Sequence, residues 1–212
     1  MSHCNYQTAY SGFLKRRYHI GSDEVLSFDF SLEYSQDLLI HEQAGGGLKA
    51  QNFVHRIKLI PSVAAEIRHN LIQLTNDYVA VHVRNTDLQT DYEKFFTTIY
   101  NKVLGKKVLL CSDDLRVIEY GVKFFDHSTV INLSNIPNLQ GRPLHLHLYD
   151  NAQSRAQASI NAIRDLVLLG SATELYVTEN KRGFISGYSK LAQYLFNNKS
   201  IIQDWLGDEQ SV

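Results

Sequence analysis

The sequence contains little cysteine, proline or methionine and carries almost no net charge. Its two cysteines, Cys4 and Cys111, exclude a framework of several disulfides and favour a reducing compartment, so we expect a cytoplasmic protein. The formal net charge of −1 leaves no global basic field to attract nucleic acid. No run approaches the roughly 18–20 apolar residues of a membrane span, and the N-terminal residues lack the apolar core of a signal peptide. We therefore expect neither a membrane span nor a nucleic-acid partner.

From residue 52 onward, short apolar runs alternate with stretches of helical periodicity. The run Tyr78–Val83 is rich in β-branched residues, as is typical of a buried parallel strand. Pro61 can open a helix, because its missing N–H costs nothing at the first helical position. Further strands are expected at 107–111, 129–133 and 175–177, and further helices at 91–104, from 113–114 to near 125, at 152–170 and at 187–196. We expect Gly170 to end its helix, and a polar tail to follow residue 196.

This alternation of strands and helices implies crossover connections. We therefore predict an α/β fold, a Rossmann-like parallel sheet with helices on both faces. Residues 1–50 show a weaker pattern, with a strand pair within 25–34, a short strand end at 37–40 and a turn at the glycines 45–47. The chain is accordingly predicted to have two parts, a short N-terminal segment over 1–50 and a ligand-binding domain over 51–212.

Polar residues gather after three of the four predicted strands. His82–Asp87 follows the first strand, Ser112–Asp114 the second, and Thr178–Ser189 the last. Ligands of parallel α/β sheets bind at the carboxyl ends of the strands. We therefore expect the three clusters to converge in one site.

The first cluster places an arginine at the end of a strand. Arg84 would present a planar, charged fork to phosphate oxygens, and Asp87 could orient that fork. The alternative is an ion pair between the two residues that only holds the loop.

The second cluster contains the neighbouring acids Asp113 and Asp114. Paired acids after a strand could bind a metal ion, but an acid that caps the following helix explains them better. His145 and His147 do not have metal-ligand spacing with other histidines, cysteines or carboxylates. We therefore expect no metal.

The third cluster and one buried acid complete the candidate site. A glycine- and serine-rich turn over 183–189 leads into a helix, where free N–H groups favour a phosphate; the alternative is an ordinary serine cap. Asp165 lies beside the apolar run 166–169, so its carboxylate needs a partner. That partner is either an arginine or a base with N–H and NH2 donors, such as guanine.

In this order, the segments resemble the α1,6-fucosyltransferases and their rhizobial nodulation relatives. Val79–Asp87 resembles the run that ends in the family's HVRRTD signature, and Cys111–Asp114 resembles the strand end that follows it. Arg164–Leu169 and Ser186–Ala192 resemble the last two blocks. The similarity covers about residues 52–196 and corresponds to the donor-binding, C-terminal half of a GT-B glycosyltransferase.

The resemblance implies an inverting, metal-independent transfer of fucose from GDP-fucose to a glycan acceptor, with no cofactor. It implies that Arg84 contacts the β-phosphate, that His82 lies beside the guanine, and that Asp165 accepts the guanine N–H groups. The same resemblance implies that Ser186 and Gly187 help to hold the diphosphate, and Tyr188 and Ser189 of that block are further candidates for nucleotide-sugar binding.

The sequence also departs from the family pattern. Asn85 replaces the second arginine of the signature, and Leu88 stands where a lysine often follows the aspartate. The family's catalytic base is a carboxylate shortly after the signature; Asp91 is the first candidate here and Glu93 the second.

The N-terminal segment is shorter than the family's N-terminal domain and is interpreted as a remnant of the acceptor domain. A homo-oligomer or a second chain could then complete the cleft. The alternative to an enzyme is a non-catalytic nucleotide-sugar or glycan-binding protein that has lost the acceptor domain. A Rossmann dehydrogenase is disfavoured, because its glycine fingerprint is missing.

Overall fold

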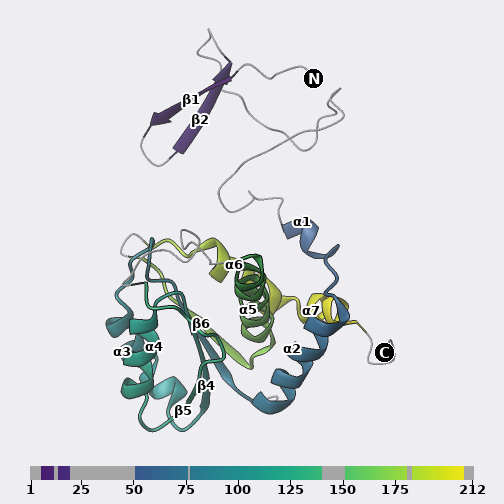
Figure 1. Ribbon diagram of the computed structural model, residues 1–212. Coiled ribbons are helices and arrows are strands. Elements are labelled where there is room, and N and C mark those ends of the chain that lie inside the picture. The colour runs from purple at the N-terminus through teal and green to yellow at the C-terminus, as the bar shows by residue number, and fades with distance from the viewer. Residues whose placement is uncertain are drawn as a thin grey trace. The chain divides into compact units, whose positions relative to one another are not determined.

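The structure is a computed structural model of the chain and describes residues 6–11, 14–19, 51–75, 77–139, 151–180 and 183–207. The chain divides into two compact units, Met1–Lys49 and Ala50–Val212. In the first unit, strands β1 (Tyr6–Ser11) and β2 (Leu14–His19) pair antiparallel (Figure 1). The sequence did not predict this hairpin. The elements predicted at 25–34, 37–40 and 45–47 lie outside the described residues, as do Cys4, His145 and His147.

The second unit is built on a parallel sheet of four strands in the order β5-β4-β3-β6. The strands are β3 (Val79–Val83), β4 (Lys107–Ser112), β5 (Thr129–Ile131) and β6 (Glu174–Val177). Val81 at the centre of β3 lies opposite Leu110 on one side and Tyr176 on the other. The prediction of an α/β fold with a parallel sheet is therefore confirmed, and β5 is two residues shorter than expected.

Helices cover both faces of this sheet (Figure 1). On one face, Ala80, Leu109 and Cys111 pack against helices α2 (Pro61–Leu74), α5 (Ala152–Ser171), α6 (Gly187–Asn197) and α7 (Lys199–Leu206). On the other, Val81, Val83 and Leu110 pack against α3 (Tyr92–Val103) and α4 (Leu115–Phe124). Because successive side chains of a strand point to opposite faces, a strand covered on both sides must be apolar throughout.

Four of the helices begin at a side chain that caps their first N–H groups. Asp91 caps α3, Asp114 caps α4, Asn151 caps α5 and Ser186 caps α6. Helix α2 has Pro61 in its first turn. Short side-chain oxygens satisfy backbone donors that have no partner inside the helix, which explains why the sequence located these starts within one or two residues.

Two predictions about the second half of the chain were wrong. Gly170 is not the stop of its helix, because α5 continues to Ser171; an added Cβ at Gly170 would stand 2.8 Å from both Leu195 and Ile202. The glycine therefore permits close packing of three helices rather than a turn. Residues after 196 include α7, a helix that buries Trp205, whose indole N–H donates to the Val54 carbonyl at 2.7 Å.

The topology identifies where a ligand would bind. The chain runs from β3 to β4 and β5 on one side, and α5 then carries it back to β6 on the other side of β3. In chain order this is the 3-2-1-4 arrangement of a doubly wound sheet, in which ligands bind where the strand order reverses. That position is the carboxyl end of β3, beside the end of β6.

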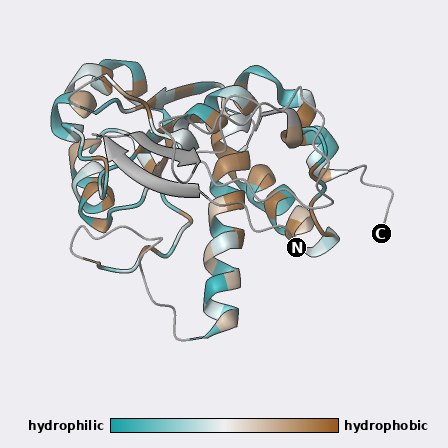
Figure 2. Cartoon of the chain, turned by 90° about the horizontal axis from the view of Figure 1, so that it is seen from above, coloured by the Kyte–Doolittle hydropathy of each residue, from teal (hydrophilic) through white to brown (hydrophobic). Residues whose placement is uncertain are grey.

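Helix α5 contributes to both the core and the site. It changes along its length from hydrophilic to hydrophobic (Figure 2), and its buried residues all lie between 164 and 170. Its second half therefore packs in the core, while its first half remains accessible. Within the described part of the chain, no helix combines the length and apolarity that a membrane crossing requires.

Candidate functional site

The three polar clusters predicted from the sequence meet at the carboxyl edge of the sheet. The Arg84 backbone N–H donates to the Thr178 hydroxyl at 3.3 Å, and the Thr178 N–H donates to the His82 carbonyl at 3.1 Å. On the other side, the Asn85 N–H donates to the Asp113 carboxylate at 2.8 Å. The segments after β3, β4 and β6 are thus linked by hydrogen bonds.

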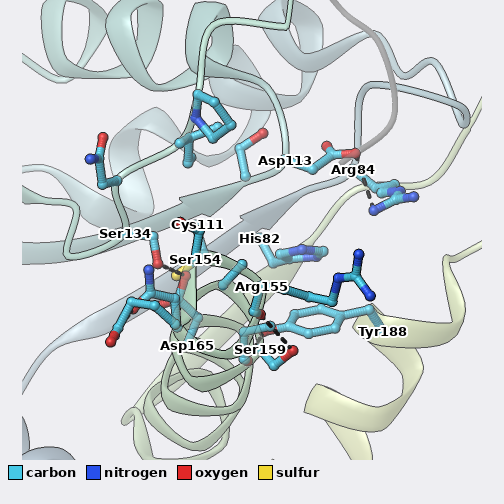
Figure 3. Close-up of a pocket in the computed structure, with 18 of the residues that line it drawn as sticks. His82, Arg84, Cys111, Asp113, Ser134, Ser154, Arg155, Ser159, Asp165 and Tyr188 are labelled. Atoms are coloured by element: carbon cyan, nitrogen blue, oxygen red, sulfur yellow. Dashed lines mark hydrogen bonds and ion pairs between the residues drawn. The ribbon is translucent and has the colours of Figure 1, made fainter. Parts of the chain in front are cut away.

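A cavity of about 1240 Å³ opens beside these strand ends (Figure 3). The ends of β3 and β4, the loop from Ser134 to Pro137, helix α5 as far as Asp165, and Tyr188 of α6 form its walls. His82, Arg84 and Asp165, for which the resemblance implies nucleotide binding, all line it. Ser186, Gly187 and Ser189 are not among the described lining residues, although Ser189 contacts His82.

Arg84 is held between two carboxylates. Its Nε donates to Asp87 at 2.8 Å, and its Nη1 lies 3.1 Å from Asp113. The side chain of Arg84 keeps 22% of its surface exposed. The ion pair considered as an alternative is therefore present, and it also fixes the guanidinium at the cavity, where a planar fork can meet phosphate oxygens.

The neighbouring acids of the second cluster have different partners. Asp113 is buried and accepts from the Asn85 N–H and the Thr86 hydroxyl, so it anchors the loop after β3. Asp114 accepts from the Arg116 N–H as the helix cap. Burial alone would raise the pKa of Asp114, but hydrogen bonds from Arg116 and Asn85 outweigh it and lower that pKa. The capping interpretation is therefore correct for Asp114.

Asp165 is buried at the cavity and has protein partners. Its Oδ2 accepts from the Ser134 hydroxyl at 2.6 Å, and its Oδ1 lies 3.4 Å from an Arg164 nitrogen. Burial raises the pKa of Asp165, and hydrogen bonds from Ser134 and attraction to Arg164 oppose that rise. A carboxylate has about four acceptor positions, so these contacts leave capacity for a ligand donor.

His82 is enclosed by residues of α6. Its Nδ1 lies 2.8 Å from the Ser189 hydroxyl, which in turn lies 2.8 Å from the Ser186 hydroxyl. Its ring is 5.0 Å from the Tyr188 ring, and the Tyr188 hydroxyl donates to the Ala162 carbonyl at 2.6 Å. Ser186 accepts the Ser189 N–H at 3.0 Å, so the serine-cap alternative holds for Ser186.

The two proposed bases lie at the start of α3. Asp91 accepts the Lys94 N–H at 3.2 Å as the helix cap, and Glu93 lies in the first turn. Neither residue is among the described residues that line the cavity. Their catalytic role stays a prediction.

Sequence reasoning did not single out two residues that organise the site. Ser134, in the loop after β5, bonds to Asp165, and Thr90 donates its hydroxyl to the Arg84 carbonyl at 3.1 Å and its N–H to Asn85 at 3.1 Å. Ser134 could have been found from the sequence, because it lies just beyond a predicted parallel strand. Thr90 follows no strand, and only the fold brings it back to residue 84.

Among the described residues, no group of three histidine, cysteine, aspartate or glutamate side chains is arranged to hold a metal ion. No protein-family model matches the chain, and no match was found among curated proteins or solved structures. The interpretation of the site therefore rests on its own geometry.

Burial of His82 makes the stability of the fold depend on pH. Burial, together with the nearby Arg84 charge, lowers the pKa of His82 from 6.5 to about 3. The imidazole stays neutral in the folded state, whereas the unfolded chain binds a proton as the pH falls below its ordinary pKa. This contribution to stability is present above that pKa and is lost as the pH falls toward 3.

As the pH is lowered below about 6, the protonation of His82 in the unfolded chain should reduce the free energy of unfolding by up to about 1.4 kcal/mol per pH unit. His82→Asn retains an acceptor or donor for Ser189 and should remove that slope. Denaturant unfolding of both proteins over this range, referenced to their difference at about pH 8, measures the effect. Parallel curves for the two proteins would mean that the fold does not lower the pKa of His82.

Proposed function

We propose that the larger unit binds a nucleotide sugar, GDP-fucose or a close relative, and acts as the donor-binding half of a fucosyltransferase-like GT-B glycosyltransferase. It would transfer fucose to a glycan acceptor with inversion and without a metal. One observation supports this most strongly: His82 and Arg84 of the first motif block line the same cavity as Asp165 of a later block. A chance likeness of short motifs would not require their side chains to meet.

The arrangement of charges fits the two ends of a nucleoside diphosphate. Arg84 supplies a guanidinium at the strand ends, where it would bind the diphosphate and stabilise the charge that develops on the departing GDP. Asp165 supplies a buried acceptor for the N–H and NH2 groups of guanine. His82 and Tyr188 lie between them as paired rings, with centroids 5.0 Å apart, and offer an aromatic surface for the base.

A non-catalytic nucleotide-sugar or glycan-binding protein is the second candidate. Asp91 favours it, because its carboxylate is engaged in capping α3 and does not line the cavity in the part of the chain that the structure describes. Transfer requires a carboxylate within hydrogen-bond reach of the acceptor hydroxyl. The two candidates share the donor site and differ only in the chemistry that follows.

Arg84 provides the test of donor binding. Arg84→Ala should weaken GDP binding by roughly 2–4 kcal/mol, as expected for loss of a close charge pair, and leave guanosine binding nearly unchanged. Arg84→Lys should restore only part of the affinity, because a point charge replaces the planar fork. Isothermal titration calorimetry measures each constant. Equal weakening of GDP and guanosine would mean that Arg84 acts only by holding the loop.

Asp91→Asn separates catalysis from capping, because asparagine caps a helix about as well as aspartate. In an enzyme with Asp91 as base, fucosyl transfer should fall by about 10²–10⁴, while the melting temperature and GDP affinity stay at wild-type values. Glu93→Gln tests the second candidate base on the same turn. Transfer that survives in both variants would exclude these residues as bases, and a wild-type chain that binds GDP-fucose without transfer or hydrolysis would favour the second candidate.

A further inference from the structure

The charges around Arg84 leave little positive potential for an anionic ligand. Its guanidinium contacts Asp87 on one side and Asp113 on the other, so one cation faces two carboxylates. Asp165 adds a third acid to the cavity, already accompanied by its own cation, Arg164. A diphosphate that enters this cavity therefore needs a positive charge that no carboxylate already neutralises.

Arg155 is such a charge. It lines the same cavity, is exposed to solvent, and extends from α5 toward the side where Arg84, His82 and Tyr188 lie (Figure 3). Its backbone N–H donates to the Asn151 carbonyl at 3.3 Å and its carbonyl accepts from Ser159 at 3.1 Å. Within the described residues, its guanidinium has neither an ion-pair nor a hydrogen-bond partner.

The surroundings of Arg155 leave it free for a ligand. The other residues that the first half of α5 contributes to the cavity are uncharged: Gln153, Ser154, Gln157, Ala158, Ser159 and Asn161. The same helix is fixed at its other end in the core, and the Tyr188 hydroxyl ties it to α6 through the Ala162 carbonyl. Among the described residues, Arg155 is thus a cavity-lining cation without an ion-pair partner, on a firmly anchored helix.

We propose that Arg155 is a second anion-binding residue, which holds the diphosphate of the nucleotide sugar together with Arg84. This inference rests on the proposed function, since it assigns a further residue to the same donor site. It also assigns separate tasks to the two arginines. Asp87 and Asp113 hold Arg84 in position at the strand ends, and Arg155 supplies a positive charge without an ion-pair partner from the wall formed by α5.

Calorimetry with GDP, guanosine and inorganic pyrophosphate tests this assignment. Arg155→Ala should weaken GDP and pyrophosphate about tenfold to a hundredfold, the range for a hydrogen bond to a charged group, and leave guanosine unchanged. Arg155→Lys should retain part of the affinity. The matched control is Arg56→Ala, which removes an exposed arginine that does not line the cavity. Melting temperatures of all variants should stay at the wild-type value.

The outcomes separate this inference from the function on which it rests. Wild-type GDP and pyrophosphate affinity in Arg155→Ala would overturn the role of Arg155 while leaving the donor site intact. Pyrophosphate binding that depends on Arg155, without any preference for GDP, would support the anion site and contradict the nucleotide assignment. A wild-type chain that binds neither ligand would contradict both.

Discussion

The parallel pairing of β3 with β4 and β6 is the constraint on which the rest of the larger unit depends. All five residues of β3 are buried, so their backbone N–H and C=O groups need partners inside the protein. The two neighbouring strands supply them, and their register places Val83 opposite Ser112 and His82 opposite Val177. The segments after these strands must therefore begin side by side, and the candidate site follows from that alignment.

Hydrogen bonds between buried polar side chains fix the positions of the segments that follow these strands. Asn85, Thr86 and Asp113 are all buried at the sheet edge, and each has at least one hydrogen bond to another strand-end segment. Leaving any one of these groups unpaired would cost about 1–3 kcal/mol, so the network stabilises one arrangement. Arg84 emerges from this network with its guanidinium already oriented. A preorganised charge requires no rearrangement when a ligand binds.

Local signals explain what the sequence predicted correctly. The β-branched run of β3 and the capping residues Asp114 and Ser186 depend on their own backbone and near neighbours, so a short window contains the information. The convergence of strand-end clusters was also predictable, because parallel sheets place equivalent ends on one edge. The α/β class with a parallel sheet followed from the same pattern.

Features that depend on distant partners could not be predicted. Gly170 suggests a helix stop in the sequence, and only the fold shows that Leu195 and Ile202 pack closely against it. The sequence of α7 resembles a polar tail because its few apolar residues are buried only by contacts with distant segments. One such contact joins Trp205 to Val54. Likewise, Asp91 and Asp87 are both acids near Arg84 in sequence, yet only Asp87 contacts it. Which polar groups meet is decided by the tertiary fold.

The most direct test of the central claim is calorimetric titration of the chain with GDP, UDP and ADP under one set of conditions. These ligands share the ribose and diphosphate and differ in the base, so their comparison isolates the contribution of the proposed guanine site beside Asp165 and His82. The account predicts that GDP binds more tightly than UDP and ADP. Equal, millimolar binding of all three nucleotides would contradict it.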